Sequence, residues 1–285
     1  MKVLIIGANG QLGTELQKSC PQNIGITAVD FPEVDLCDSA SVYRIVKETA
    51  PDYVINAAAY TAVDLAESEP ERAALINSEG VRHLAQAVKE QGGRLVHIST
   101  DFIFDGQKGT PYLPEDTPSP QSVYGRTKLD GENAVREIFG DQSLIIRTAW
   151  LYSVTGNNFV KTILKLMAER DSLNVVDDQI GTPCCASGLA QTVWKAIDKE
   201  ATGIFHWTDA GVASWYDFAV AIQEEALTLG ILEKPIPVNP ISSISYPTPA
   251  KRPSYSVLDK TAAINELDMV PVHWRVQLRD MLKGL

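Results

Sequence analysis

A tyrosine and a lysine four residues apart, Tyr124 and Lys128, form the pair of side chains with the clearest chemical potential in this sequence. They lie in SVYGRTKLDGE, just after a run rich in Pro, Asp and Ser. Residues four apart share one face of a helix. A free phenol has a pKa of about 10, and a nearby ammonium group favours the phenolate and lowers that pKa. The spacing therefore indicates an acid with its tuning cation, although Tyr-x-x-x-Lys also arises by chance in many proteins.

A threonine, Thr100, supplies the third group that the reduction of a ketone needs. It lies in HISTDFIFDG, at the carboxyl end of a strand predicted over 94–99. Ligands of open α/β sheets bind outside such strand ends, and a helix predicted from about residue 122 presents Tyr124 and Lys128 to the same crevice. Hydride that reaches a ketone carbon creates an alkoxide that needs a proton. We expect Tyr124 to donate it, Lys128 also to bond the nicotinamide ribose, and Thr100 to orient the carbonyl oxygen, where negative charge develops.

The elements that must position these groups alternate along the first half of the chain. Strands are predicted over 2–6, 24–30, 53–57, 94–99 and 143–147, with helices over 11–19, 39–49, 71–91 and 122–139. Ser39 suits the N-cap of the second helix, ahead of an apolar stripe. Strand–helix alternation indicates a parallel sheet covered on both faces, which right-handed crossovers make doubly wound. The predicted fold class is therefore α/β, with a Rossmann-type sheet.

The second half of the chain has a looser pattern after about Trp150. Helices are predicted over 158–169, 186–197 and 274–282 and after Ser214, with strands over 173–176 and 203–207. The prolines of 233–253 favour loops and edge segments. We expect a dinucleotide-binding domain over 1–150 and a smaller, mainly substrate-binding domain over 151–285. Segment 171–198 is predicted to return to the first domain.

A glycine-rich loop, GANGQLG, follows the first strand and opens a helix. Gly7, Gly10 and Gly13 are spaced G-x-x-G-x-x-G, not G-x-G-x-x-G as in most dehydrogenases. In this context glycine lets the backbone approach a pyrophosphate, which sits at the positive end of the helix. Asp30 ends the second strand, where a carboxylate would bond the ribose 2′-OH and repel a 2′-phosphate. The loop predicts dinucleotide binding, and Asp30 favours NADH over NADPH unless it only caps the turn.

The composition excludes several classes of partner. The formal net charge is −11, whereas nucleic-acid backbones select for an excess of Lys and Arg. No apolar run approaches the roughly 20 residues of a membrane span, and the chain opens on a strand without a signal-peptide pattern. The four cysteines and four histidines show no metal or disulfide spacing. We therefore expect a cytoplasmic protein that binds neither nucleic acid nor membrane.

These motifs together resemble the extended short-chain dehydrogenase/reductases. GANGQLG, NAAAYTAVD, STDFIFDG, YGRTK, RTAWLY, GNNFVKT and DQIGTP also resemble one branch, the dTDP-4-dehydrorhamnose reductases, and the similarity extends from residue 2 through PTPAKRPSYSVLD. The resemblance implies that NADPH or NADH reduces the 4-keto group of dTDP-4-dehydro-L-rhamnose (dTDP-4-dehydro-6-deoxy-L-mannose) to give dTDP-L-rhamnose. Family members often use either cofactor.

The resemblance also implies roles for individual residues. Thr100, Tyr124 and Lys128 match the catalytic trio of the family, and Tyr124 and Lys128 also contact the cofactor. The other positions that match cofactor contacts are Gly7, Asn9, Gly10, Gln11, Leu12, Gly13, Asp30, Asp35, Leu36, Ala58, Ala59, Tyr60 and Thr61. The positions that match a place near the sugar nucleotide are Asp101, Phe102, Trp150 and Asn158. Arg252 is predicted separately to grip the diphosphate bidentately, with solvated loop charge as the alternative.

Related activities remain as alternatives. Sugar-nucleotide 4,6-dehydratases need a carboxylate directly after Thr-Asp, where this chain has Phe102. The sequence excludes another sugar-nucleotide reductase or an epimerase only weakly. A non-catalytic regulatory subunit that binds a dinucleotide would not need a tuned acid, so the Thr100, Tyr124 and Lys128 set argues against that alternative. Some family members bind Mg²⁺ across a dimer interface through acidic residues, in part near the C-terminus. Here Asp280 is the only carboxylate side chain of RVQLRDMLKGL, so we expect no metal site, and a monomer or a different homodimer.

Overall fold

The computed structural model describes all of residues 1–285, and its central element is a six-stranded parallel sheet. In spatial order the strands are β10 (Gly203–His206), β5 (Leu144–Thr148), β4 (Arg94–Thr100), β3 (Tyr53–Asn56), β1 (Lys2–Ile6) and β2 (Gly25–Val29). The inner strands are almost continuously apolar because both of their faces are covered. The predicted fold class is confirmed.

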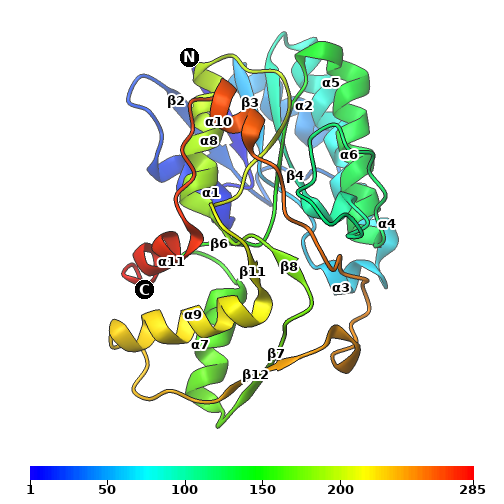
Figure 1. Cartoon of the computed structure of the whole chain (residues 1–285). Coiled ribbons are helices and arrows are strands. Elements are labelled where there is room, and N and C mark those ends of the chain that lie inside the picture. The colour runs from blue at the N-terminus through cyan, green and yellow to red at the C-terminus, as the bar shows by residue number, and fades with distance from the viewer.

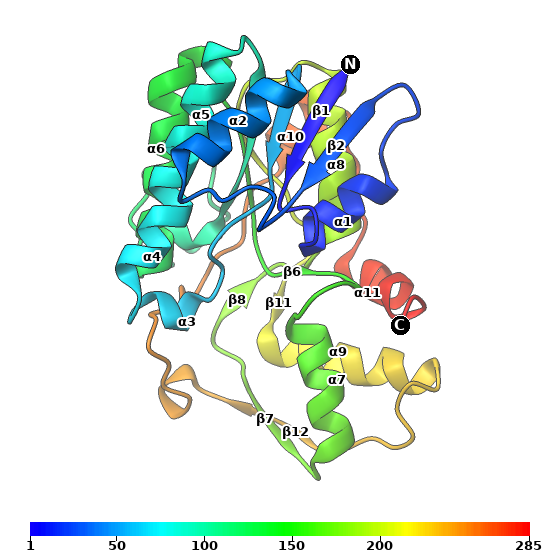
Figure 2. The same cartoon turned by 180° about the vertical axis from the view of Figure 1, so that it is seen from behind.

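Helices pack on both faces of this sheet (Figures 1 and 2). One face carries α2 (Ser39–Thr49), α5 (Gly80–Glu90) and α6 (Val123–Phe139), and the other carries α1 (Gln11–Lys18), α8 (Ala186–Asp198) and α10 (Thr261–Glu266). Successive residues of a strand point to opposite faces. Leu4 and Ile6 therefore join the core under α2, α5 and α6, whereas Val3 and Ile5 join the core under α1 and α8.

Two local predictions about helices need correction. The N-cap of α2 is Asp38, not Ser39, because the Asp38 carboxylate accepts a hydrogen bond of 3.0 Å from the backbone N–H of Ala40. The helix predicted over 71–91 is continuous but not uniform. It begins with α4 (Pro70–Ala74), passes through a π-helical turn at Leu75–Glu79 and continues as α5.

A second hydrophobic core lies beyond the carboxyl ends of the sheet, in the lower part of Figure 1. It is built mainly from α7 (Phe159–Glu169), α9 (Trp215–Thr228) and α11 (Trp274–Leu282). Three two-stranded sheets connect to it: β7 (Leu173–Val176) with β12 (Val238–Ile241), β6 (Leu151–Tyr152) with β9 (Cys184–Cys185), and β8 (Ile180–Gly181) with β11 (Ala213–Ser214). No helix combines the length and the apolar character that crossing a membrane requires.

The segment 171–198, which is predicted to return to the first domain, has its strand and its helix in different places. Helix α8 packs on the large sheet, and β10 then adds to the sheet edge beside β5. Strand β7 instead pairs with β12 outside the sheet. Its residues alternate between buried and more exposed positions, which is typical of a sheet with one solvated face. The division of the chain into two domains at residue 150 stays a prediction.

Candidate active site

A cavity of about 650 Å³ lies at the carboxyl ends of the parallel strands. It collects residues from the glycine loop, from the ends of β3, β4 and β5, and from the start of α6. The predicted site residues that line it are Gly7, Gly10, Gln11, Leu12, Asp30, Ala58, Ala59, Thr61, Thr100, Asp101, Phe102, Tyr124, Lys128 and Trp150. The catalytic trio and the phosphate loop therefore face one space, although Gly7 and Lys128 lie 121 positions apart in the chain.

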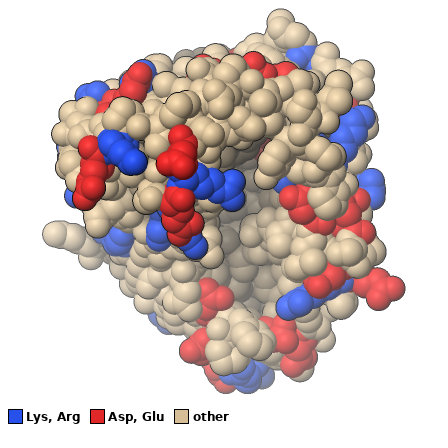
Figure 3. All heavy atoms as spheres, turned by 90° about the horizontal axis from the view of Figure 1, so that it is seen from below, with Lys and Arg blue, Asp and Glu red and all other residues tan.

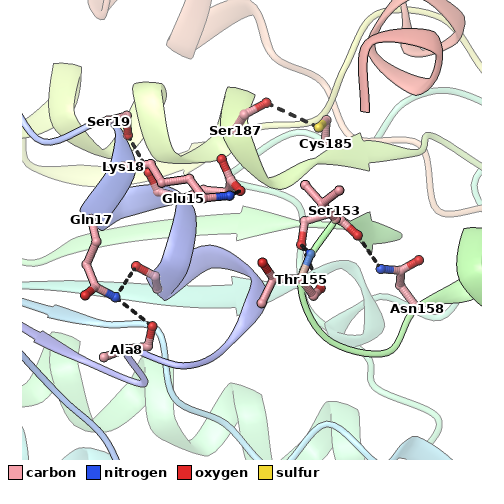
Figure 4. Close-up of polar contacts among 12 residues, drawn as sticks. Ala8, Glu15, Gln17, Lys18, Ser19, Ser153, Thr155, Asn158, Cys185 and Ser187 are labelled. Carbon is pink, nitrogen blue, oxygen red and sulfur yellow. Dashed lines mark hydrogen bonds and ion pairs between the residues drawn. The ribbon is translucent and has the colours of Figure 1, made fainter. Parts of the chain in front are cut away.

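The glycine loop packs so closely that side chains are excluded at two positions. Gly7 has a positive φ of 88°, and a Cβ there would lie 2.7 Å from the backbone nitrogen of Ala58. A Cβ on Gly13 would lie 2.0 Å from the carbonyl oxygen of Gly7. The side-chain amide of Gln17 fixes the loop by donating to the carbonyl oxygens of Ala8 (2.8 Å) and Gly13 (3.1 Å) (Figure 4).

The start of α1 suits a bound diphosphate. Its N-cap, Gly10, has no side chain that could accept hydrogen bonds from the first backbone N–H groups of the helix, and the first turn carries no acidic residue. Gln11 and Leu12, the first two helical residues, line the cavity. Unpaired N–H groups at the positive end of a helix bind anions. The residues present therefore fit the dinucleotide that the glycine spacing predicts.

Replacing Gly13 with alanine tests this close packing. The added Cβ must push α1 away from the Gly7 carbonyl, so we expect NADPH to bind at least about tenfold more weakly, which corresponds to about 1.4 kcal/mol. Isothermal titration with NADPH measures the loss. Gly109→Ala is the matched control, because nothing lies within 4 Å of a Cβ there and its φ is ordinary. Equal affinity of Gly13→Ala and wild type would contradict the packing argument.

Asp30 lies at the junction of two cavities. Its carboxylate accepts 2.8 Å hydrogen bonds from the backbone N–H groups of Asn9 and Phe31, so it does cap the turn, the alternative considered above. It also lines both the large cavity and a neighbouring one of about 390 Å³. Asp35 and Leu36 line only the second cavity. An elongated dinucleotide fits two adjoining spaces, with the smaller one suited to its adenosine end.

Tyr60 lies outside both cavities and braces the chain after β3. Its backbone N–H donates to the side-chain oxygen of Asn77 (2.9 Å), whose amide nitrogen donates back to the Tyr60 carbonyl (3.1 Å). The Tyr60 hydroxyl donates to Glu69. These bonds keep the lining residues Ala58, Ala59 and Thr61 in place. The cofactor contact expected for Tyr60 stays a prediction.

Small residues on the inner face of α6 let this helix approach the turn after β4 and the π-helical turn at Leu75–Glu79. A Cβ on Gly125 would lie 2.2 Å from the carbonyl oxygen of Phe102, and one on Gly131 would lie 2.2 Å from that of Asn77. Ser122 caps the helix by accepting from the N–H of Gly125 (3.1 Å). This approach sets Tyr124 and Lys128 beside Thr100, as the sequence predicts.

The hydroxyl of Thr100 links the end of β4 to its neighbours. It donates to the carboxylate of Asp101 (3.1 Å) and accepts from the backbone N–H of Phe102 (3.2 Å). The Phe102 ring packs edge-on against the ring of Tyr124, with 5.4 Å between centroids. Asp101 is buried, and its burial raises the pKa of its carboxyl to about 6 against the hydrogen bonds that it accepts.

The acidity of Tyr124 differs from the prediction. Burial raises the pKa of its phenol to about 12; a hydrogen bond from Thr100 opposes this rise and the charge of Asp101 adds to it. The expected lowering of this pKa by Lys128 is not found: the Lys128 ammonium donates to the backbone carbonyl of Ile98 (2.7 Å), and burial is the largest influence on the phenol. Tyr124 is thus neutral at pH 7 and still carries the proton that a ketone reduction requires.

The protonation of Lys128 predicts how cofactor affinity depends on pH. Burial lowers the pKa of Lys128 to about 8, with Glu132 opposing the shift. Bonds to ribose hydroxyls would favour the ammonium and raise that pKa on binding. The NADPH dissociation constant should therefore be flat below about pH 8 and rise above it by up to about tenfold per pH unit. Calorimetric titrations across this range, with Lys128→Met as the variant that loses the dependence, measure the effect. A flat profile in wild type contradicts it.

Trp150 forms part of the cavity wall between the two cores. It has a positive φ of 45°, a strained backbone conformation for a non-glycine residue. Its indole stacks on Trp215 of α9, with centroids 3.5 Å apart and an interplanar angle of 7°. A Cβ on Gly181 would lie 2.7 Å from the Trp150 ring. The stacked pair holds the wall rigid, and its contact with substrate stays a prediction.

Asn158 and Arg252 do not line the cavity. Asn158 caps α7, and its side-chain amide donates to the carbonyl of Ser153 (2.7 Å) (Figure 4). The same amide donates to Gln11 (3.0 Å), so it positions a cofactor-loop residue. Arg252 is held bidentately by Asp64, at 2.9 and 2.7 Å. Asp64 therefore holds the guanidinium in this structure, and the diphosphate contact of Arg252 stays a prediction.

The sequence reasoning missed other residues of the cavity wall, among them Ser99, Thr148 and Asn157. Thr148 lies directly beside Thr100 in the register of β4 and β5. The rule that ligands bind at the carboxyl ends of parallel strands could have found it. Asn157 lies in the turn before α7 and gave no comparable signal. No group of three or more His, Cys, Asp or Glu side chains is arranged to hold a metal ion.

Comparison with known proteins assigns the family. The model of the RmlD substrate binding domain matches residues 1–285. A dTDP-4-dehydrorhamnose reductase of Aggregatibacter actinomycetemcomitans is 41% identical, with 98% of each chain covered. This chain belongs to the dTDP-4-dehydrorhamnose reductase family. The resemblance drawn from the sequence motifs is confirmed.

Solved structures of dTDP-4-dehydrorhamnose reductases also superpose on nearly the whole chain. The one from Clostridium acetobutylicum has a TM-score of 0.93 at 41% identity, covering 100% of this chain and 99% of its own. The one from Bacillus anthracis, in complex with NADP, has a TM-score of 0.93 at 34% identity with the same coverage. The family fold therefore extends over both cores and over the cavity between them.

Proposed function

We propose that this protein reduces the 4-keto group of dTDP-4-dehydro-L-rhamnose to dTDP-L-rhamnose, with NADPH or NADH as cofactor. The observation that carries the proposal is the convergence of Thr100, Tyr124 and Lys128 on the cavity that the glycine loop also lines. The relative from Aggregatibacter actinomycetemcomitans, aligned over 98% of each chain, is a dTDP-4-dehydrorhamnose reductase, and the Bacillus anthracis reductase was solved in complex with NADP. The protein is thus an NAD(P)H-dependent oxidoreductase.

Some residues of this chain bind the cofactor, and others orient the ketone or transfer a proton to it. The bound nicotinamide supplies the hydride. The N–H groups at the start of α1 hold the diphosphate of the cofactor, and Lys128 donates to its ribose hydroxyls. Thr100 orients the ketone oxygen, and Tyr124 gives that oxygen its phenolic proton as negative charge develops there. With a pKa of about 12, the phenol keeps this proton until an alkoxide is present to take it.

The test follows the loss of NADPH and NADH absorbance, in separate reactions, when dTDP-4-dehydro-L-rhamnose is added. The proposal predicts rapid oxidation and formation of dTDP-L-rhamnose. The corresponding UDP-linked keto-sugar tests the nucleotide, and the ratio of the two cofactors tests the effect of Asp30. If neither cofactor is oxidised although the protein still binds NADPH, the proposal is contradicted and the regulatory-subunit alternative remains. Conversion of the keto-sugar into an epimer without net loss of NADPH would indicate an epimerase.

We also propose that the protein works in the cytoplasm and does not bind nucleic acid. Positive and negative side chains are interspersed on the face seen in Figure 3, and the net charge is −11, which supports a protein that does not bind nucleic acid. None of the four cysteines is in a disulfide, as suits the reducing cytoplasm. We infer a monomer or a homodimer, because the residues to which the proposal assigns the chemistry line one cavity of one chain.

A further inference from the structure

The smaller of the two adjoining cavities, which suits the adenosine end of a dinucleotide, is lined by a single cation. Most of its lining residues are hydrophobic, and the charged ones are Asp30, Asp35 and Arg72. Arg72 comes from α4, whereas the two carboxylates come from the segment after β2. The larger cavity is also lined by one cation, Lys128. Each end of the proposed cofactor site therefore offers one positive side chain.

The guanidinium of Arg72 is held only weakly by other side chains. The Arg72 side chain is 67% exposed, and its one ion pair, with Glu69, is 3.5 Å long. The same oxygen of Glu69 already accepts a hydrogen bond from the Tyr60 hydroxyl at 2.9 Å. The guanidinium carbon lies 6.0 Å from the centroid of the Tyr60 ring, at the outer limit of a cation–π contact. Exposed ion pairs contribute little free energy, so Arg72 is available to a stronger anionic partner.

Hydrogen bonds from the backbone offset part of the negative charge in this cavity. The two oxygens of the Asp30 carboxylate accept one N–H group each, from Asn9 and Phe31, at 2.8 Å. One oxygen of Asp35 accepts from the N–H of Cys37 at 2.9 Å. Such donors stabilise the charge of a carboxylate. The two carboxylates therefore repel a phosphate in this cavity less than free carboxylates would.

We propose that Arg72 binds the 2′-phosphate of NADPH, so that the protein binds NADPH more tightly than NADH. This inference rests on the proposed function, which leaves the choice between the two cofactors open. In dinucleotide-binding folds an acidic residue after the second strand lies beside the adenosine ribose, and a nearby Arg accommodates a 2′-phosphate. Arg72 lines the same cavity as Asp30, and its planar guanidinium donates two parallel N–H bonds to phosphate oxygens. The ribose of NADH offers only a hydroxyl, so Arg72 reverses the preference for NADH that Asp30 alone favours.

Calorimetric titrations with NADPH and with NADH test the proposal without substrate. Arg72→Met should weaken NADPH binding by at least about tenfold, the low end for a hydrogen bond to a charged group, and should leave the Kd of NADH unchanged. Arg136→Met is the matched control, because Arg136 is exposed on α6 and lines neither cavity. Unchanged NADPH affinity in Arg72→Met, or an equal loss of affinity for both cofactors, overturns the proposal. A wild-type protein that binds NADH as tightly as NADPH overturns it as well.

Two fragments of the cofactor isolate the 2′-phosphate from the rest of the dinucleotide. Adenosine 2′,5′-bisphosphate and 5′-AMP differ only in that group. Wild type should bind the bisphosphate more tightly, and added salt should reduce the difference because it screens exposed charges. Arg72→Met should abolish the difference, whereas Arg72→Lys, which keeps the charge without the planar pair of donors, should retain part of it. Equal binding of the two fragments by wild type overturns the proposal. A protein that selects NADPH through Arg72 but reduces no 4-keto-sugar instead contradicts the proposed function alone.

Discussion

Tyr124→Phe is expected to bind NADPH as wild type does and to lose turnover by a factor of roughly 10²–10⁴, the range that general acid–base catalysis contributes. The substitution removes one oxygen atom and leaves the ring, which packs edge-on against Phe102. The cavity wall therefore stays in place while the proton donor is lost. No other phenol lines the cavity, so no neighbouring tyrosine can replace it.

Steady-state kinetics and calorimetric NADPH titration on the same preparation make this comparison. Tyr246→Phe is the matched control, because Tyr246 is exposed and lies outside the cavity. It should keep both kcat and NADPH affinity. A Tyr124→Phe variant that retains kcat would show that another group, or water, protonates the substrate oxygen. A variant that loses NADPH binding would instead point to a structural role for the hydroxyl.

Arg147→Met is expected to destabilise the fold by about 3–5 kcal/mol, because it leaves the charge of Glu132 buried and unpaired. Arg147 and Glu132 have side chains only 2% and 1% exposed, and two hydrogen bonds of 2.9 and 2.7 Å join them. Arg147 also donates to the carbonyl of Pro114 (2.9 Å). It lies 3.3 Å from His206, whose pKa burial and this guanidinium lower to about 3. The ion pair thus ties together β5, α6, β10 and the loop before α6.

Equilibrium unfolding in urea measures the loss for Arg147→Met. Arg275→Met is the matched control, because Arg275 pairs with Glu224 at the surface (2.6 Å). Its second partner, Glu225 (3.6 Å), keeps its closer ion pair with Arg279 (2.7 Å), so the variant should cost at most about 1 kcal/mol. The double variant Glu132→Leu with Arg147→Met removes both charges and should recover much of the stability. If Arg147→Met is no less stable than Arg275→Met, the buried pair does not stabilise the fold as argued.

The fold could be predicted in outline because its strongest signals are local. Apolar β-branched runs such as KVLII form buried parallel strands wherever helices cover both faces, and the boundaries of most elements agree within one or two residues. The pairing of strand β7 could not be predicted, because its partner, β12, lies 65 residues further along the chain in a proline-rich stretch without strand periodicity. The N-cap of α2 was misassigned because Asp38 and Ser39 are both good capping residues.

The site could be predicted where a rule ties residue type to position in the sheet. Thr100 at a strand end, Tyr124 and Lys128 one turn apart, and the glycines before α1 all follow such rules. The pairing of Arg252 with Asp64 joins residues 188 positions apart, and no local pattern encodes it. The raised pKa of Tyr124 could not be predicted from the sequence either. Its sign depends on how deeply the phenol is buried and on the turn of Lys128 toward Ile98, which only the folded chain determines.

The most direct test of the central claim traces the hydride itself. The protein is incubated with dTDP-4-dehydro-L-rhamnose and NADPH that carries deuterium on the transferable position of its nicotinamide, and the sugar product is examined by NMR and mass spectrometry. The proposed reduction predicts dTDP-L-rhamnose with one deuterium, at C4. Product without deuterium at C4, deuterium at another carbon, or unchanged keto-sugar in the presence of bound NADPH would contradict it.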